Sequence, residues 1–202
     1  MDLSNFGLLL QMVEKACLVI IVVYLLSFTG LFNFLSGKKP SAGIQVLLAI
    51  IFGILAIYGT YSGVQTSGAI SNIRNLGPMI AGLIAGPWVG LGAGLIGGLH
   101  RWFFIGGFTA IPCGIGTILS GLLAGFLYMM FKGKIGIWKP ALYAFVMEIA
   151  DMALILLIAG PFDKALALVN VIAMPMILGD TIGVAIFAFM LKDMIKRKSG
   201  AR

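Results

Sequence analysis

Charged residues are scarce in this chain, and their scarcity excludes most classes of protein. They make up 10% of the 202 residues, against about 25% in an average soluble domain. A soluble globular protein, a disordered chain and a nucleic-acid binder all need more charge than this. One histidine and two cysteines, Cys17 and Cys113, are too few for a metal cluster or a disulfide framework. We therefore expect no metal, no cofactor and no nucleic-acid partner.

Hydrophobic residues are abundant instead, at 60% of the chain. One helical crossing of a bilayer needs about 20 apolar residues. Six apolar runs of about that length cover 8–28, 42–61, 78–99, 107–131, 138–160 and 165–191. The sequence therefore predicts an all-α, polytopic bundle of six transmembrane helices surrounded by membrane lipid. It forms a single domain over 1–202 with a short basic tail at 192–202.

The net charge of +7 is explained first by orientation, since cytoplasmic loops collect Lys and Arg. Six crossings put both chain ends on one side, and the basic tail places that side in the cytoplasm. Nine basic residues then lie inside and four outside. Those inside are Arg74, Lys132, Lys134, Lys139, Lys192, Lys196, Arg197, Lys198 and Arg202, and those outside are Lys38, Lys39, Arg101 and Lys164.

Glycine recurs every four residues through the third run, at Gly82, Gly86, Gly90, Gly94 and Gly98. Such a stripe lies along one side of a helix and lets a neighbouring backbone approach closely. Close helix packing is the first interpretation. A pocket for a small ligand between thin helices and a homodimer contact are the alternatives.

Ionisable residues inside a membrane are costly and are usually paired or functional. Glu148 and Asp151 are three residues apart, so they share a helical face, and Asp180 lies beside Gly179. With His100, at the end of the third run, they are the candidate buried polar or coupling residues. The acids admit three interpretations: structural pairing, a proton or cation relay, or neutral carboxyls at a ligand site.

Two arginines have surroundings that favour a ligand site over a simple interfacial role. Arg74 lies in the sequence Asn72-Ile73-Arg74-Asn75, and Arg101 precedes Gly106-Gly107-Phe108-Thr109 and Cys113. A guanidinium beside a glycine-rich turn and hydroxyl groups suits a carboxylate. No nucleophile with a base is evident, so an enzyme is not expected.

These motifs resemble the receptor domain of LytS-type sensor histidine kinases, also called the LytS–YhcK five-transmembrane receptor domain. The resemblance rests on Asn-x-Arg at 72–74, His-Arg at 100–101, Gly-Gly-Phe-Thr-Ala at 106–110 and Met-Pro-Met at 174–176. It covers essentially the whole chain. It implies a sensory input domain of a bacterial plasma membrane, normally followed by a soluble signalling region, often a GAF domain with a histidine kinase.

The resemblance also implies a ligand and the residues that bind it. Members of the family are associated with extracellular pyruvate or with murein hydrolase expression. The family's proposed pyruvate site has two arginines, a cysteine and a serine, which correspond here to Arg74, Arg101, Cys113 and, in place of the serine, Gly116. Thr117 could supply a hydroxyl, and Asn72 and Thr109 complete the candidate ligand-binding set. A second departure is Asp180, where the family often has Asn.

Helix geometry conflicts with a site shared by both arginines. They are 27 residues apart, which is about 40 Å along one continuous helix. Either one arginine binds the ligand, or the chain reverses at Gly86-Pro87 as a re-entrant hairpin over 76–99, leaving five spans. The unbroken glycine stripe favours six spans, with Arg101 and Cys113 at the ligand and Arg74 in a structural or coupling role.

Two functions from different classes follow. The first is a receptor that binds a small extracellular solute, such as the monocarboxylate pyruvate, and signals to a cytoplasmic kinase-type region or partner. The alternative is a transporter subunit, because glycine-rich six-helix chains of this length resemble the substrate-capture components of energy-coupling-factor transporters. A structural membrane scaffold would explain the glycines but not the positions of the arginines and acids.

Overall fold

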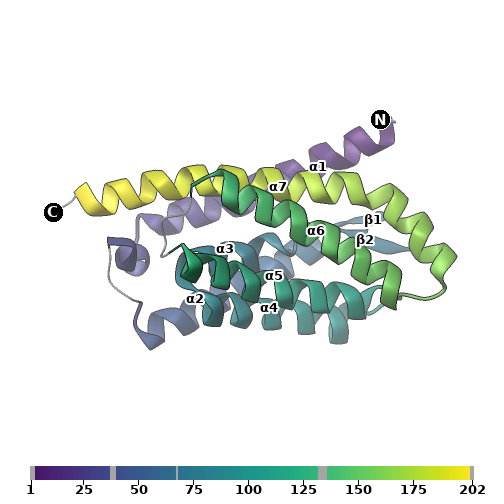
Figure 1. The fold of residues 1–202 in the computed structure, drawn as a ribbon, viewed down its shortest axis with the longest axis horizontal. Helices are drawn as coiled ribbons and strands as arrows, with labels where there is room; N and C mark the ends of the chain where they lie inside the picture. Colours follow the sequence, from purple (N-terminus) through teal and green to yellow (C-terminus); the bar gives the residue numbers. More distant parts are fainter. Residues whose placement is uncertain (1–2, 37–39, 67, 132–135, 201–202) are drawn as a thin grey trace.

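The structure is a computed structural model that describes residues 3–36, 40–66, 68–131 and 136–200. Almost all of them are helical, as predicted (Figure 1). Five helices in this part of the chain are long and apolar enough to cross a membrane. They are α1 (Leu3–Ser27), α2 (Ala42–Tyr61), α5 (Ala110–Met130), α6 (Trp138–Ile158) and α7 (Phe162–Gly200).

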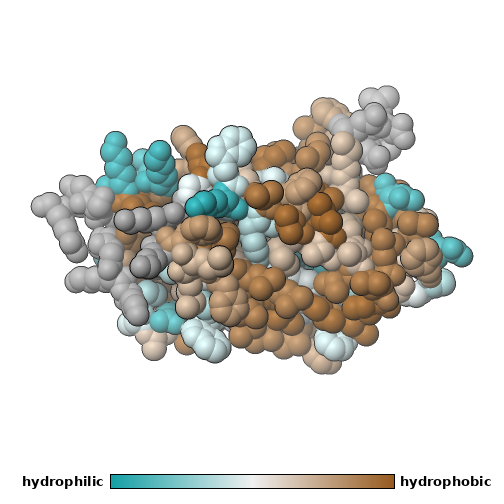
Figure 2. Space-filling view, in the orientation of Figure 1, coloured by the Kyte–Doolittle hydropathy of each residue, from teal (hydrophilic) through white to brown (hydrophobic). Residues whose placement is uncertain are grey.

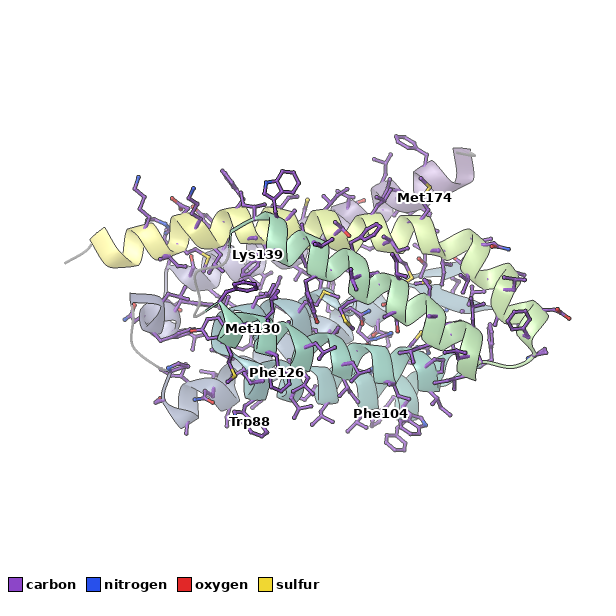
Figure 3. The ribbon with its side chains drawn as sticks, viewed as in Figure 1. Trp88, Phe104, Phe126, Met130, Lys139 and Met174 are labelled. Atoms are coloured by element: carbon purple, nitrogen blue, oxygen red, sulfur yellow. The ribbon has the colours of Figure 1, made fainter. Side chains whose placement is uncertain are left out.

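Apolar side chains cover the outside of the bundle as well as its interior. Trp138, Leu157 and Phe104 each expose more than three quarters of their surface. Figure 2 shows hydrophobic residues across the middle of one face and hydrophilic residues towards its two ends. In Figure 3, Trp88 and Phe104 point away from the bundle. A molecule with this surface is suited to a lipid environment, because water would leave large apolar patches exposed.

The third apolar run is not one helix, so the expectation of a continuous helix over 76–99 is wrong. It forms two short helices, α3 (Leu76–Ala85) and α4 (Pro87–His100), separated by Gly86. Gly86 has φ +92° and ψ −178°, a region essentially restricted to glycine, and Pro87 occupies the first turn of α4, where its missing N–H does no harm. The two helices fold back on each other: a Cβ at Gly90 would lie 2.9 Å from the Cα of Gly82.

Gly86→Ala is therefore expected to destabilise the domain by about 1–3 kcal/mol, since alanine rarely adopts this backbone conformation. Steric contact adds little, because the nearest atom to a Cβ there is Tyr128 Cδ1 at 3.8 Å. Thermal unfolding in detergent measures the effect. Gly136→Ala is the control, because a Cβ at Gly136 meets nothing within 4 Å. Equal melting temperatures for the two variants would contradict the reversal at Gly86.

The glycine stripe packs the α3–α4 hairpin directly against α5. A Cβ at Gly82 would lie 2.4 Å from the carbonyl oxygen of Gly121, and one at Gly98 would lie 2.6 Å from that of Gly114. Gly94 likewise faces the backbone of Thr117 and Ile118. Because these glycines are buried within one chain, they are not available for the dimer contact considered from the sequence.

Short elements connect the helices. A 3-10 helix, Gly30–Ser36, follows α1, and a single π-helical turn, Arg101–Ile105, follows α4. Strands β1 (Val64–Thr66) and β2 (Ala69–Ser71) pair antiparallel, Gln65 opposite Ile70. In Figure 1 this small hairpin lies towards the end of the molecule opposite the C-terminus.

The C-terminal part of α7 is fastened to the end of α1. Arg197 Nη2 donates to Ser27 Oγ at 3.3 Å, and Nε pairs with Asp193 Oδ2 at 3.0 Å. The Arg197 guanidinium also lies over the rings of Tyr24 and Phe28, at 5.1 and 4.5 Å. Five basic residues used for orientation, Lys38, Lys39, Lys132, Lys134 and Arg202, lie outside the described residues.

Candidate functional site

Arg74 is fully buried at the entrance to α3, against the first half of α5. Its Nε donates to Thr117 Oγ1 at 2.7 Å, and its Nη2 donates to the carbonyl of Cys113 at 3.3 Å. Nη1 has no hydrogen-bond partner among the described residues. A buried cation with a free N–H has unsatisfied capacity for an anion.

Two asparagines flank Arg74 and have different tasks. Asn72 folds back on the backbone, donating to the carbonyl of Ile70 at 2.7 Å and accepting from the N–H of Arg74 at 3.0 Å. It positions Arg74 as an Asx turn does. Asn75 links three elements: its Nδ2 donates to Glu148 Oε1 at 2.8 Å, and its Oδ1 lies 2.8 Å from the Thr117 hydroxyl.

Thr117 is the junction of this network. Its oxygen accepts from Arg74 and lies 2.8 Å from both the Asn75 amide oxygen and the Cys113 carbonyl. A hydroxyl has one proton, so it donates to only one of these acceptors at a time. The hydroxyl expected at a ligand site is thus engaged by the protein's own polar groups.

Arg101 lies at the start of the π-helical turn that follows α4. Its Nη1 donates to the carbonyl of Gly106, and Nη2 donates to Thr109 Oγ1 at 3.1 Å. Gly106 and Gly107 have φ of +66° and +92°, which lets the chain turn back over the guanidinium. Arg101 Nε is buried without a partner in the described part of the chain.

The two arginines lie at the same end of the α3–α4 hairpin. The sequence interpretation that we preferred placed Arg74 and Arg101 at opposite faces of the membrane, and the structure corrects it. Arg101 contacts Thr109 and Arg74 contacts Cys113, and these residues are joined by the first turn of α5, Cys113 N–H to Thr109 carbonyl at 3.1 Å. Burial, followed by the nearby Arg74 charge, lowers the pKa of Arg101 from its ordinary value. The reversal at Gly86 is what brings them together.

Three buried carboxyl groups, on α6 and α7, lie near Arg74. Glu148 and Asp151 share a face of α6, as their spacing predicts, and Asn75 Nδ2 lies 2.8 and 3.5 Å from their oxygens. Asp180 on α7 is fully buried and interacts electrostatically with Glu148. Oxygens of all three carboxyls are without hydrogen-bond donors among the described residues.

The absence of a side chain at position 116 has a structural reason that the sequence does not reveal. A Cβ at this position would lie 1.8 Å from Asp151 Oδ1. The absent side chain therefore makes space for the Asp151 carboxyl against α5, between the turn that holds Cys113 and the one that holds Thr117.

The remaining candidates surround this cluster. The Cys113 side chain is buried and forms no disulfide within the described residues. His100 lies at the edge, stacked on Phe104 with ring centroids 5.4 Å apart and edge-on to Tyr61 at 5.3 Å. No group of three or more His, Cys, Asp or Glu side chains able to hold a metal is present among the described residues.

Asn75 is the main residue that the sequence analysis missed. It bridges α3, α5 and α6, yet an asparagine beside an arginine carries no pattern of its own. Tyr143 is another: its hydroxyl donates to the carbonyl of Ser120 and ties α6 to α5 below the cluster. A buried tyrosine needs such a partner.

The fold and the enclosed polar cluster define a multi-pass helical membrane domain. Comparison with known families makes this specific. Residues 28–194 match the family described as "5TMR of 5TMR-LYT", and the chain belongs to that family, as the motifs predicted.

Curated relatives are sensor kinases of which this chain matches one part. It is 36% identical to the sensor histidine kinase BtsS of Escherichia coli K12, with 94% of this chain and 35% of BtsS covered. It is 34% identical to the sensor protein LytS of Bacillus subtilis, covering 96% and 36%, and 33% identical to the sensor histidine kinase YpdA of Escherichia coli K12, covering 98% and 35%. The chain thus spans about a third of these relatives' length. No solved structure matches.

Proposed function

We propose that this domain is the input module of a membrane sensor, which binds a small carboxylate from the outer side and signals to a cytoplasmic kinase region. Its relatives are named sensor kinases, and the matched part is about 35% of BtsS. Kinase chemistry would then lie in the part of such a protein that this chain does not match.

One observation carries the binding proposal. Two buried arginines, which contact Cys113 in the first turn of α5 and Thr109 just before it, each keep a nitrogen without a protein partner among the described residues: Nη1 of Arg74 and Nε of Arg101. Two guanidinium groups beside one helix suit a single carboxylate, which accepts several N–H bonds at once. Thr109, Cys113 and Thr117 supply the wall of the site.

The α3–α4 hairpin is best explained as a re-entrant segment that enters from the outer side and returns. Helices of 10 and 14 residues reach about 15 and 21 Å, short of the roughly 30 Å hydrocarbon core. Nine of the ten residues of α3 are buried by the surrounding helices. Non-helical backbone such as that at Gly86 is tolerated at membrane depth where protein covers it.

Helix α7 offers the route from the site to the cytoplasm. It places Asp180 in the polar cluster and continues to Arg197, which is hydrogen-bonded to Ser27 at the end of α1. Its 39 residues extend about 58 Å, so it is long enough to leave the membrane. A ligand that binds one arrangement of the cluster better than another would shift α7 relative to α1.

Isothermal titration of the detergent-solubilised domain with pyruvate tests the proposal. We expect the wild type to bind and Arg101→Ala to lose at least tenfold in affinity, because the variant removes a charged donor worth about 1.5–3 kcal/mol.

The matched control is Arg197→Ala, which removes the same side chain at the other end of the bundle and should bind as the wild type does. An Arg101→Ala variant with wild-type affinity would place the ligand elsewhere. Absence of pyruvate binding to the wild type would exclude pyruvate as the ligand.

A further inference from the structure

A groove lies between α1 and α7 towards the C-terminal end of the bundle. It has a volume of about 290 Å³ and is lined by Ile21 and Tyr24 from α1 and by Phe189, Met190 and Asp193 from α7. Ile21 and Phe189 expose 57% and 65% of their surface. The groove is therefore on the outside of the bundle, and four of its five lining residues are apolar or aromatic.

A second hollow continues this groove towards the end of α7. It has a volume of about 220 Å³ and is lined by Phe189, Lys192, Asp193 and Lys196, so the two hollows share Phe189 and Asp193. Positions 189, 192 and 196 are three and four residues apart, which places them on one face of α7. Together the two hollows form one surface, the α1–α7 groove, which is apolar at one end and basic at the other.

The basic end of the α1–α7 groove carries an excess of positive charge. Residues 189–197 include three basic residues, Lys192, Lys196 and Arg197, and one acid, Asp193. The Asp193 carboxylate is paired with Arg197 at 3.0 Å, and Lys192 forms no ion pair with any described residue. Both lysines are exposed, and Figure 2 shows hydrophilic residues at this end of the molecule.

This charge is complementary to the membrane surface expected beside it. The basic C-terminal tail assigns this end of the bundle to the cytoplasmic side, where anionic lipids give the leaflet a negative surface potential. A soluble anion would contact the lysines and leave the apolar end of the groove empty. A neutral lipid would fill the apolar end and leave the lysines unmatched.

We propose that the α1–α7 groove binds an anionic phospholipid of the cytoplasmic leaflet, with its phosphate at Lys192 and Lys196 and an acyl chain along Tyr24 and Phe189. This inference is independent of the solute proposed for the buried arginines. The lipid contacts both helices beside the Arg197 guanidinium, which lies 5.1 Å from the centre of the Tyr24 ring. Bound lipid therefore holds α7 against α1 near the end of the bundle.

Titration of the detergent-solubilised domain with dioleoylphosphatidylglycerol and dioleoylphosphatidylcholine tests this, with native mass spectrometry to count bound lipids. We expect the anionic lipid to bind at least tenfold more tightly and to raise the melting temperature, because a ligand of the folded state stabilises it. Glycerol 3-phosphate, which has the phosphate but no acyl chain, should not displace the anionic lipid at equal concentration.

The double variant Lys192→Gln/Lys196→Gln should weaken binding of the anionic lipid at least tenfold and leave the neutral lipid unchanged. Each basic residue near an anionic surface contributes about fivefold in affinity. The matched control is Lys139→Gln/Lys164→Gln, which removes the same charge at two exposed lysines outside the groove and should change binding less than threefold.

Equal losses in the two double variants would reduce the effect to general attraction by net charge and overturn the proposal. Equal affinity for the two lipids, or displacement by glycerol 3-phosphate, would overturn it as well. A lipid-free dimer that separates in the Lys192→Gln/Lys196→Gln variant would assign the groove to a second copy of the chain instead. All four substituted lysines are exposed, so both variants are expected to fold, which circular dichroism checks.

Discussion

Gly90→Ala is expected to destabilise the domain by at least about 3 kcal/mol, at the upper end of overpacking effects. A Cβ at Gly90 would lie 2.0 Å from the carbonyl oxygen of Gly121, and a Cβ at Gly121 would lie 2.1 Å from that of Gly90. Both obstacles are backbone, so no side chain can rotate away. The whole hairpin must separate from α5, which a fall in melting temperature in detergent measures.

The matched control for Gly90 is Gly43→Ala, in the first turn of α2. A Cβ at Gly43 meets nothing within 4 Å, so its effect should stay within about 0.5 kcal/mol, as at other surface sites. Similar melting temperatures for the two variants would show that α4 and α5 are further apart than described here.

Arg74→Met is the second change with a large expected effect, about 3–5 kcal/mol of stability together with loss of solute binding. Methionine fills much of the volume but removes the hydrogen bonds that Arg74 donates to the Cys113 carbonyl and the Thr117 hydroxyl. It also removes a nearby cation from Glu148, Asp151 and Asp180, and breaking up a buried charge cluster typically costs this much. Thermal unfolding and pyruvate titration measure the two effects.

Arg197→Met controls for the general loss of an arginine. Arg197 is about one third exposed and pairs with Asp193 within one helix, a contact worth about 0.3–0.5 kcal/mol. Its cation–π contacts add about 0.5–1 kcal/mol. If Arg74→Met were no more destabilising than Arg197→Met, the buried cluster would not depend on Arg74.

Most of the helices could be predicted from hydrophobic run length, because a spanning helix needs a continuous apolar stretch. The runs at 42–61 and 138–160 correspond to α2 and α6 nearly to the residue. The third run could not be resolved this way, since a spanning helix and a hairpin of two buried helices have the same composition. Gly86 has the same four-residue spacing as the other glycines of the stripe, so the sequence did not reveal that the helix is interrupted there.

The members of the buried polar cluster could be recognised in the sequence as charged residues within apolar segments. Arg74, Arg101, Glu148, Asp151 and Asp180 are conspicuous because ionisable groups are rare in apolar segments. Their grouping was not predictable, because it depends on the fold of 76–99. Gly116 illustrates the limit: its missing side chain has meaning only once Asp151 is placed opposite.

The reversal at Gly86 also bears on the relative direction of the first and last helices. The α3–α4 hairpin turns back on itself, and the five helices long and apolar enough to cross a membrane are an odd number, so α1 and α7 run in the same direction. Ser27, at the end of α1, accordingly meets Arg197, near the end of α7, and Figure 1 shows the two termini at opposite ends of the molecule. The first and last helices therefore end side by side, so the 3-10 helix Gly30–Ser36 that follows α1 is adjacent to the last part of α7.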